Sequence, residues 1–526
     1  MTIWLDWTAE AFARAKAQGR PILATVGPFP SEHLKAAEEE IGLRFVAVLA
    51  DPQTRPDAAA RIGPKHALIL DPEGARRAVL PLPYPALGES LARLAFEAVS
   101  PLRPDGPAAS AWTGAVREAD TVAAPDEAKI FGVLAALGTL PAGPEPDPDF
   151  VSALLHGAGE RGDAEAFKAL TRALELRMAG WDATRRSFLP APGSSLSLHA
   201  RWAAVFWDAH ALTGEARWRT AAEGITDHLL RALWDVSAGA FRRAGKPEPV
   251  VYPADGNALA ASALFRAHAF GHPGAGDAAL KALSFLQNRL YDPLLGFQHA
   301  AGGEGESVFG LLGDAVAVAL AFTDGFLATG IKAHREFSDA TMRFLFQELW
   351  ERDGGGFLDR VCRADDPAVL REPHLDPALN AAALEICRRL HHLKGNHNYR
   401  RWLEWGLKGA WNAAPDDARV RAGLARVADL HARGRMDFEL VGRPGESKTD
   451  ALLAAVNRLY LPRKVISFVD PDDQDYILAH HLGAESYPRV FGCGADLRRL
   501  ADAGDPEGVL AVAEAVAHAV KPGGAP

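Results

Sequence analysis

Trp234-Asp235-Val236-Ser237-Ala238-Gly239-Ala240-Phe241 is the stretch that decides the fold, because its pattern occurs four times in the chain. In each copy an aromatic residue and an acidic residue precede a short turn that ends at a phenylalanine. The other copies run from Trp181 to Phe188, from Tyr291 to Phe297 and from Trp350 to Phe357. Their leading aromatics are 53, 57 and 59 residues apart, which suits two helices and their loops. The repeat predicts a stack of helical hairpins.

The segments between these markers read as two kinds of helix. Those that end at a marker lack proline and carry apolar residues at helical spacing, which predicts outer helices: Ala216 to Leu233, Asp277 to Leu290 and Lys332 to Leu349. Those that follow a marker are richer in alanine and more apolar, which predicts inner helices packed on nearly every side: Asn257 to Phe270, Asp314 to Leu327 and Asn380 to Leu390. Alternation of the two kinds predicts an α/α toroid of about six hairpins.

The composition narrows the classes of partner. The chain has 526 residues, 48% of them hydrophobic, and a net charge of −10 without a basic stripe, so we expect several domains and no nucleic-acid partner. The start, Met1 to Trp7, has no positive segment leading into an apolar one, and no run of about 18 apolar residues occurs, so we expect a cytoplasmic protein without a membrane partner. Cys362, Cys387 and Cys493 show no metal-ligand spacing, so neither a metal nor another cofactor is expected.

The two ends of the chain show a different sequence pattern, with short apolar strands. Within the first hundred residues, short apolar strands alternate with helices, at Pro21 to Val26, Phe45 to Leu49, Ala67 to Leu70 and Ala78 to Leu82, and a proline-rich linker follows at Pro101 to Pro107. Three more strands are predicted near the C-terminus: Phe438 to Val441, Lys464 to Val469 and Arg489 to Phe491. We therefore divide the chain into an α/β domain at 1–105, a toroid at 106–432 and an α/β segment at 433–526.

Short motifs along nearly the whole chain carry a resemblance to a known family. They are Trp7, Arg20-Pro21-Ile22, Asp51 with Arg55-Pro56-Asp57, Leu68 to Gly74, Val205-Phe206-Trp207-Asp208, Gly313-Asp314-Ala315, Pro377 with Asn380, Arg458 to Pro462 and Tyr487 to Cys493. In this order they resemble proteins that join a thioredoxin-like domain to a six-hairpin toroid of the glycosidase and sugar-epimerase type, including the spermatogenesis-associated thioredoxin-like proteins. The resemblance implies a thioredoxin-like domain at 1–105 and a carbohydrate-like ligand in the toroid.

Two departures from that family restrict the chemistry. The family's Cys-x-x-Cys stretch is replaced by the loop from Gly27 to His33, which contains no cysteine. Because dithiol exchange needs an attacking thiolate and a resolving thiol, we expect a redox-inactive domain retained for packing or recognition. The family's His-Phe-Glu-Lys stretch reads Arg201-Trp202-Ala203-Ala204 here, so any chemistry of that histidine and glutamate is lost. His199 lies two residues away, about 200° around a helix.

Alignment of the repeats predicts the ligand site. It places Trp202, Asn257, Asp314 and Asn380 at equivalent positions, each opening an inner helix. Parallel inner helices would bring their N-termini to one mouth of the toroid, where free N–H groups favour polar ligands. Helix capping explains the Asn and Asp residues equally well. Asp208 falls inside a helix, where an aspartate needs a partner or a ligand.

Two classes of function remain open. A carbohydrate-active enzyme would use Asp208 and Asp314 for hydrolysis, or His199 and His374 as bases for epimerisation. The residues expected to bind the ligand are Arg201, Trp202, Trp207, Asn257 and Asn380. The alternative is a noncatalytic pseudoenzyme that binds a ligand or a protein partner, which the missing dithiol and the missing histidine and glutamate favour.

Overall fold

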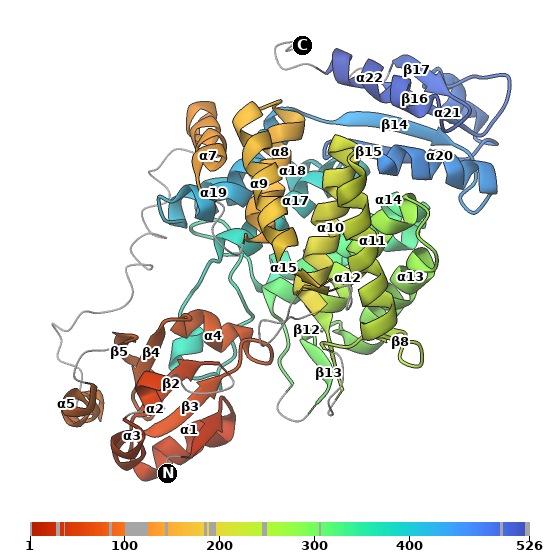
Figure 1. Ribbon diagram of the computed structural model, residues 1–526. Coiled ribbons are helices and arrows are strands. Elements are labelled where there is room, and N and C mark those ends of the chain that lie inside the picture. The colour runs from red at the N-terminus through yellow and green to blue at the C-terminus, as the bar shows by residue number, and fades with distance from the viewer. Residues whose placement is uncertain are drawn as a thin grey trace.

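The computed structural model describes residues 3–27, 32–35, 37–83, 87–99, 125–141, 146–182, 187–188, 196–244, 250–303, 307–494 and 498–520. An N-terminal α/β unit, a helical toroid and a C-terminal α/β unit follow one another along the chain, and the two α/β units lie at different ends of the toroid (Figure 1). Residues 28–31 of the cysteine-free loop and the predicted linker at 101–107 lie outside the described residues.

The toroid consists of six pairs of helices within the described residues. The inner helices are α8 (Pro148–Glu160), α10 (Leu196–Thr213), α12 (Ala254–Ala269), α14 (Leu312–Thr329), α17 (Pro377–Lys394) and α19 (Ala418–Ala432). Their outer partners are α9 (Ala164–Ala179), α11 (Ala216–His228), α13 (Ala275–Phe285), α15 (Lys332–Glu348), α18 (His397–Ala413) and α7 (Glu127–Thr139). Each inner helix packs on its two inner neighbours, and α19 closes the ring against α8 and α7. The predicted toroid is confirmed.

Local sequence fixes the ends of these helices. In α17 the Asp376 carboxylate accepts hydrogen bonds from the N–H groups of Ala378 and Leu379, and Pro377 occupies the first turn, where its missing N–H costs nothing. The helix ends at Gly395 with φ of 65°, a left-handed conformation that glycine adopts without strain. Helix α14 is long and apolar enough to span a membrane, but 72% of its span is buried inside the toroid.

The four sequence markers form short two-stranded ladders that turn the chain from an outer to an inner helix. Trp181 pairs with Phe188, Trp234 with Phe241, Tyr291 with Phe297 and Trp350 with Phe357. The acidic residue of the marker shapes the turn, since the Asp235 carboxylate accepts hydrogen bonds from the backbone N–H groups of Ser237 and Ala238. Each aromatic ring packs on the phenylalanine of its own ladder where both are described, as Trp234 does on Phe241.

The N-terminal unit is a five-stranded sheet in the order β1-β3-β2-β4-β5. Its strands are β1 (Trp4–Asp6), β2 (Ile22–Val26), β3 (Val46–Ala50), β4 (His66–Leu70) and β5 (Arg76–Pro81), and its helices are α1 (Ala9–Gln18), α2 (Glu32–Lys35), α3 (Glu38–Arg44), α4 (Pro56–Ile62) and α5 (Leu87–Val99). Strands β1, β3 and β2 are parallel, whereas β4 and β5 are antiparallel additions. Strand β1 was not predicted.

The C-terminal unit repeats the topology of the N-terminal one without its first strand. Strands β14 (Met436–Val441), β15 (Lys464–Val469), β16 (Arg489–Cys493) and β17 (Arg499–Ala503) lie in the order β15-β14-β16-β17. The first pair is parallel and crosses over through α20 (Ser447–Arg458), and the other two pairs are antiparallel. Helices α21 (Gln474–Ala479) and α22 (Val509–Ala519) complete the unit. In the N-terminal unit, strands β3, β2, β4 and β5 lie in the corresponding order, with the same succession of one parallel and two antiparallel pairs.

Buried polar contacts fix the N-terminal unit to the toroid. The Arg61 guanidinium contacts both carboxylate oxygens of Asp359, and Arg360 of the toroid donates to the buried Asp57 carboxylate. The short helix α16 (Ala368–Arg371) lies in the loop after this arginine, and two of its apolar side chains join the core of the N-terminal unit. The two parts therefore form one packed body.

Candidate functional site

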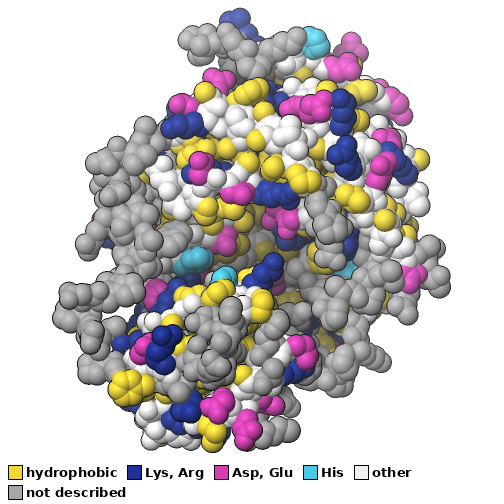
Figure 2. Space-filling model, turned by 60° about the vertical axis from the view of Figure 1, so that its left-hand side comes forward, with side chains coloured by type: hydrophobic (Ala, Val, Ile, Leu, Met, Phe, Trp, Pro, Cys, Tyr) yellow, Lys and Arg dark blue, Asp and Glu magenta, His cyan; other side chains and the backbone are white. Residues whose placement is uncertain are grey.

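A large cavity of about 1160 Å³ lies inside the toroid. One end, which we call the mouth, is lined by Gln53 of the N-terminal unit and by Asp255 and Asp314 in the first turns of inner helices. The other end, the floor, is lined by Asp208 and by residues 459–462 and 464 of the C-terminal unit. Figure 2 shows a hollow between the N-terminal unit and the toroid, bordered by charged and histidine side chains. The inner-helix N-termini share the mouth, as predicted.

A buried histidine joins the toroid to the N-terminal unit at the mouth. His299 Nδ1 lies 3.0 Å from each carboxylate oxygen of Asp314, and its Nε2 lies 3.0 Å from the carbonyl oxygen of Gln53. Burial disfavours a charged ring, but Asp314, Asp255 and the Gln53 carbonyl outweigh it and raise the pKa of His299 to about 10. The ring is therefore an imidazolium that donates from both nitrogens.

Carboxylates and one arginine form the rest of the mouth. The Asp255 carboxylate accepts a hydrogen bond from the Ser197 hydroxyl at 3.0 Å and stays partly exposed. The Arg201 guanidinium contacts Asp149. Burial opposes its charge, but Asp149 more than compensates and raises the pKa of Arg201. His374 also lines the cavity, where burial lowers its pKa and favours the neutral ring.

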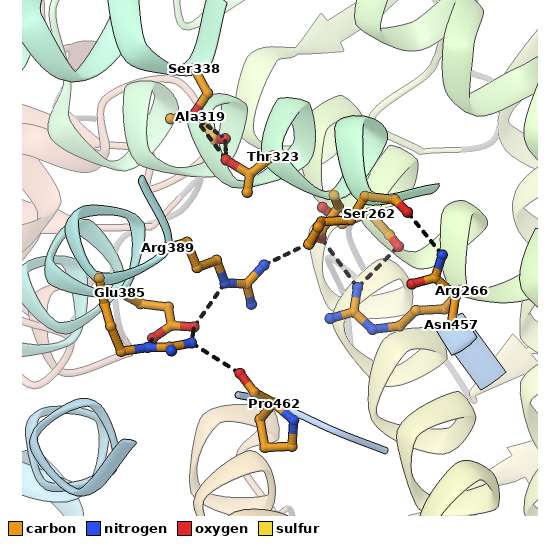
Figure 3. Close-up of polar contacts among 12 residues, drawn as sticks. Ser262, Arg266, Ala319, Thr323, Ser338, Glu385, Arg389, Asn457 and Pro462 are labelled. Atoms are coloured by element: carbon orange, nitrogen blue, oxygen red, sulfur yellow. Dashed lines mark hydrogen bonds and ion pairs between the residues drawn. The ribbon is translucent and has the colours of Figure 1, made fainter. Parts of the chain in front are cut away.

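A chain of ion pairs crosses the floor between four inner helices, and Figure 3 shows Arg266, Glu385 and Arg389 of this chain. Arg266 of α12 contacts Asp208 at 3.1 Å and Asp324 at 3.4 Å, and Arg389 of α17 contacts Asp324 at 2.8 Å. Arg389 also contacts Glu385 at 2.8 Å. Burial would raise the pKa of Asp324, but its two arginines lower it, so the carboxylate is ionised. The network holds α10, α12, α14 and α17 together around the cavity.

Three further polar groups reach the floor from elements remote in sequence. Tyr460 and Lys464 come from the C-terminal unit and Arg426 from α19, and all three line the cavity. Burial lowers the pKa of Lys464 to about 8; the charges of Arg266 and Arg389 add to this shift, and Asp208 opposes it. Burial and the nearby Asp208 charge raise the pKa of Tyr460, which keeps its hydroxyl protonated.

Two of the residues predicted to bind ligand hold the markers instead. The Asn257 side chain accepts from the N–H of Phe241 and donates to the carbonyl oxygens of Phe241 and Pro253. The Asn380 side chain makes the same three bonds to Phe357 and Asp376. Both are fully buried and neither lines the cavity. The expectation that these two side chains converge on the ligand site is therefore wrong. The capping alternative is also wrong, because each asparagine is the fourth residue of its helix and not the residue before it.

The predicted site residues of α10 divide between the core and the cavity. Trp202 is fully buried, and Trp207 donates from Nε1 to Thr226, so both are core residues and their placement at the ligand was wrong. Because α10 begins at Leu196, the fourth position that matches Asn257 belongs to His199 rather than to Trp202. His199 is buried, stacks on His228 and does not line the cavity.

The other predicted residues do line the cavity, but at different depths. Asp314, Arg201 and His374 lie at the mouth, and Asp208 lies deeper, on the floor, as expected. Other residues that join them there were not predicted from the sequence. These are Asp255, Arg266, Arg426, Tyr460 and Lys464. One signal was visible: Asp314 is an acidic residue in the first turn of α14, one position before the place where α12 and α17 carry their asparagines, and it binds His299.

A metal ion does not fit the mouth as it stands. The ligand atoms of Asp255, His299 and Asp314 lie within 4.8 Å of one another. However, both ring nitrogens of His299 donate to oxygen acceptors, and a metal needs the lone pair of a neutral imidazole. We therefore treat this cluster as a hydrogen-bonding surface.

A scan against protein-family models and a search of curated proteins gave no match. Solved structures similar to this chain include the GH76A α-1,6-mannanase from Salegentibacter sp. HEL1_6 (13% identity, 58% of this chain and 99% of that one, TM-score 0.47). A D-mannose isomerase (10%, 54% and 86%, 0.45) and a sugar epimerase from a ruminal bacterium (15%, 45% and 68%, 0.39) are also similar. At these identities and TM-scores the likeness gives no information on the chemistry of the present chain.

Proposed function

We propose that the toroid binds a carbohydrate-like polyol in its cavity, with the mouth as the principal recognition surface. The observation that carries this proposal is the partly exposed Asp255 carboxylate, which accepts a hydrogen bond from Ser197 in a cavity that also contains the Arg201–Asp149 pair and is lined by apolar as well as charged side chains. Placed polar groups beside apolar wall residues are typical of small-molecule sites. Carboxylate oxygens accept hydrogen bonds from sugar hydroxyl groups.

Hydrolysis is the form of processing that the mouth favours. Glycoside hydrolysis uses two carboxyl groups, one of them held as the acid. Burial raises the pKa of Asp314, although the His299 imidazolium opposes this shift. Asp255 is the carboxylate that can touch a substrate directly, and Asp314, whose two oxygens both face His299, would have to turn from the histidine to serve as the acid. Epimerisation finds less support, since of the two proposed bases only His374 lines the cavity.

A noncatalytic scaffold is the alternative, and a different observation favours it. Buried ion pairs, Arg61 with Asp359 and Arg360 with Asp57, fasten the N-terminal unit over the mouth. We propose that this unit is thioredoxin-like, which its strand order supports, and that it acts as a fixed wall of the site in a cytoplasmic protein rather than as a redox domain. In that case the chain presents a ligand-stabilised surface to a protein partner.

The test is binding of neutral sugars to the full chain by isothermal titration calorimetry, with a panel of mono-, di- and trisaccharides. Asp255→Asn should weaken binding of any sugar that the parent binds by about tenfold or more, and Asp353→Asn, which changes an exposed marker-turn aspartate, should not. NMR of the bound sugar detects hydrolysis or epimerisation directly. If no sugar binds the parent, the proposal fails; if sugars bind without any product, the scaffold is favoured.

A further inference from the structure

The floor of the cavity carries more positive than negative charge. Four cationic side chains line it, Arg266, Arg389, Arg426 and Lys464, against the three carboxylates of Asp208, Asp324 and Glu385. Those carboxylates are already paired. Asp208 and Asp324 contact Arg266 or Arg389, and Glu385 contacts Arg389 and also the buried Arg388 behind the wall. Arg426 and Lys464 are the two cations of the floor that these ion pairs leave out.

Neither of these two cations has a carboxylate partner among the described residues. Arg426 makes no ion pair or hydrogen bond there, although its neighbours on α19 are used fully: Asp429 contacts His156, Arg161 and Arg433. Lys464 makes a single long hydrogen bond of 3.4 Å from Nζ to the Val456 carbonyl oxygen. A partly buried cation is costly unless it is paired or hydrogen-bonded. Two such cations facing one cavity suit an anionic ligand group.

The groups around them suit an oxyanion in particular. The Tyr460 side chain lines the floor beside them, and its hydroxyl, held protonated by burial and the Asp208 charge, is available as a donor. A guanidinium, an ammonium and a phenol are all donors to phosphate or carboxylate oxygens. The floor carboxylates make their ion pairs with Arg266 and Arg389, and none of them forms an ion pair with Arg426 or Lys464 among the described residues.

We infer that the floor binds an oxyanion, a phosphate or a carboxylate, carried at one end of the polyol that occupies the cavity. This inference rests on the proposed function, because it names the class of polyol: a sugar phosphate or a sugar acid. Arg426 and Lys464 hold the oxyanion and Tyr460 donates a third hydrogen bond, while the hydroxyl groups of the ligand extend toward Asp255 at the mouth.

The test compares glucose, glucose 6-phosphate, gluconate and inorganic phosphate by titration calorimetry of the full chain at fixed ionic strength. The inference expects each anionic sugar that fits to bind about tenfold or more tightly than glucose. Arg426→Gln and Lys464→Met should each remove that advantage, whereas Arg352→Gln, which removes an exposed cation of a marker turn, should leave it intact. Binding of the phosphate sugar alone, or of gluconate alone, identifies the oxyanion.

A measurement on the parent protein tests the inference even if the variants fail to fold. Acetylation of lysines, followed by mass spectrometry, should show that glucose 6-phosphate or gluconate protects Lys464 and leaves the exposed Lys281 of α13 unaffected. If glucose binds as tightly as its anionic derivatives and Lys464 is not protected, the inference is wrong and the proposed function stands. If no sugar of either kind binds, both are overturned.

Discussion

Arg61 of the N-terminal unit and Asp359 of the toroid, 298 residues apart, form a buried ion pair with two hydrogen bonds of 2.7 and 3.1 Å. Their side chains are only 3% and 8% exposed. The same guanidinium donates to the carbonyl oxygens of Val369 and Glu372, so its donors are used within the interface. The N-terminal unit is therefore a fixed cover of the mouth.

Asp359→Ala should destabilise the protein by about 3–5 kcal/mol, because it leaves the Arg61 charge buried without a partner. Chemical denaturation monitored by circular dichroism measures the change. The matched control is Glu223→Ala, which breaks the exposed Arg219–Glu223 pair on α11 and should cost no more than about 0.5 kcal/mol. Equal effects of the two variants would mean that the interface does not hold the N-terminal unit.

Asp314→Asn should also be strongly destabilising at pH 7, by about 3 kcal/mol, since it removes the counter-ion of the His299 imidazolium. The pKa of His299 rises from 6.5 to about 10 on folding, so its stabilising contribution is complete below about pH 6.5. That contribution is lost as the pH rises through 10. Thermal unfolding at several pH values should show this loss in the parent and little of it in the variant. A cost below about 1 kcal/mol at pH 7 would contradict the ion pair.

Asn380→Ala should destabilise the toroid by at least about 1–3 kcal/mol, because the buried N–H of Phe357 loses its acceptor. Ligand affinity of the folded variant should stay within about twofold of the parent, since Asn380 does not line the cavity. Asn288→Ala, which removes an exposed side-chain bond to Ser284, is the control. A loss of affinity at unchanged stability would restore Asn380 to the binding site.

Because of Glu439 in β14, we expect the stability of the C-terminal unit to depend on pH. Burial and the neighbouring Asp437 raise the pKa of Glu439 from 4.5 to about 7. The folded protein therefore keeps a proton that the unfolded chain loses, and stability falls as the pH rises from about 4.5 to 7. Glu439→Gln should raise the melting temperature at pH 8 and leave it nearly unchanged at pH 4.5. The exposed Glu485→Gln should have no effect at either pH, and a lower melting temperature of Glu439→Gln at pH 8 would refute the assignment.

The chain should not accelerate the reduction of insulin by dithiothreitol. No cysteine lies in the loop from Gly27 to His33, and burial raises the pKa of both Cys362 and Cys387, which suppresses their thiolates. A turbidity assay against a buffer blank checks this. Acceleration would mean that one of these cysteines or Cys493 has a redox role.

The repeat was predictable because it is local. Trp234 and Phe241 are seven residues apart, and a turn of this kind needs only its own aspartate and glycine. The limits of an outer helix followed from its apolar spacing, as in Lys332–Glu348. The inner helices begin two or three residues before their predicted starts at Asn257, Asp314 and Asn380. The short strand Trp4–Asp6 was not predicted, because three residues are too few to show the alternation of a strand.

Most of the site was not predictable because it forms only when distant segments meet. The Gln53 carbonyl and His299 are 246 residues apart, and Lys464 reaches the floor from beyond the last toroid helix. No sequence spacing links them. The regular positions of Asn257 and Asn380 led to the wrong prediction of a shared ligand site. They reflect a repeated structural hydrogen bond to the marker phenylalanine.

The two α/β units also decide what shape of molecule the protein can accept. Residues 459–462 and 464 line the floor, whereas the N-terminal unit leaves a hollow beside the mouth. A polymer that enters at the mouth would meet these C-terminal segments at the floor. If the substrate is a polysaccharide, the protein therefore takes hold of a chain terminus and not an internal segment, so that any cleavage would release short units from the end.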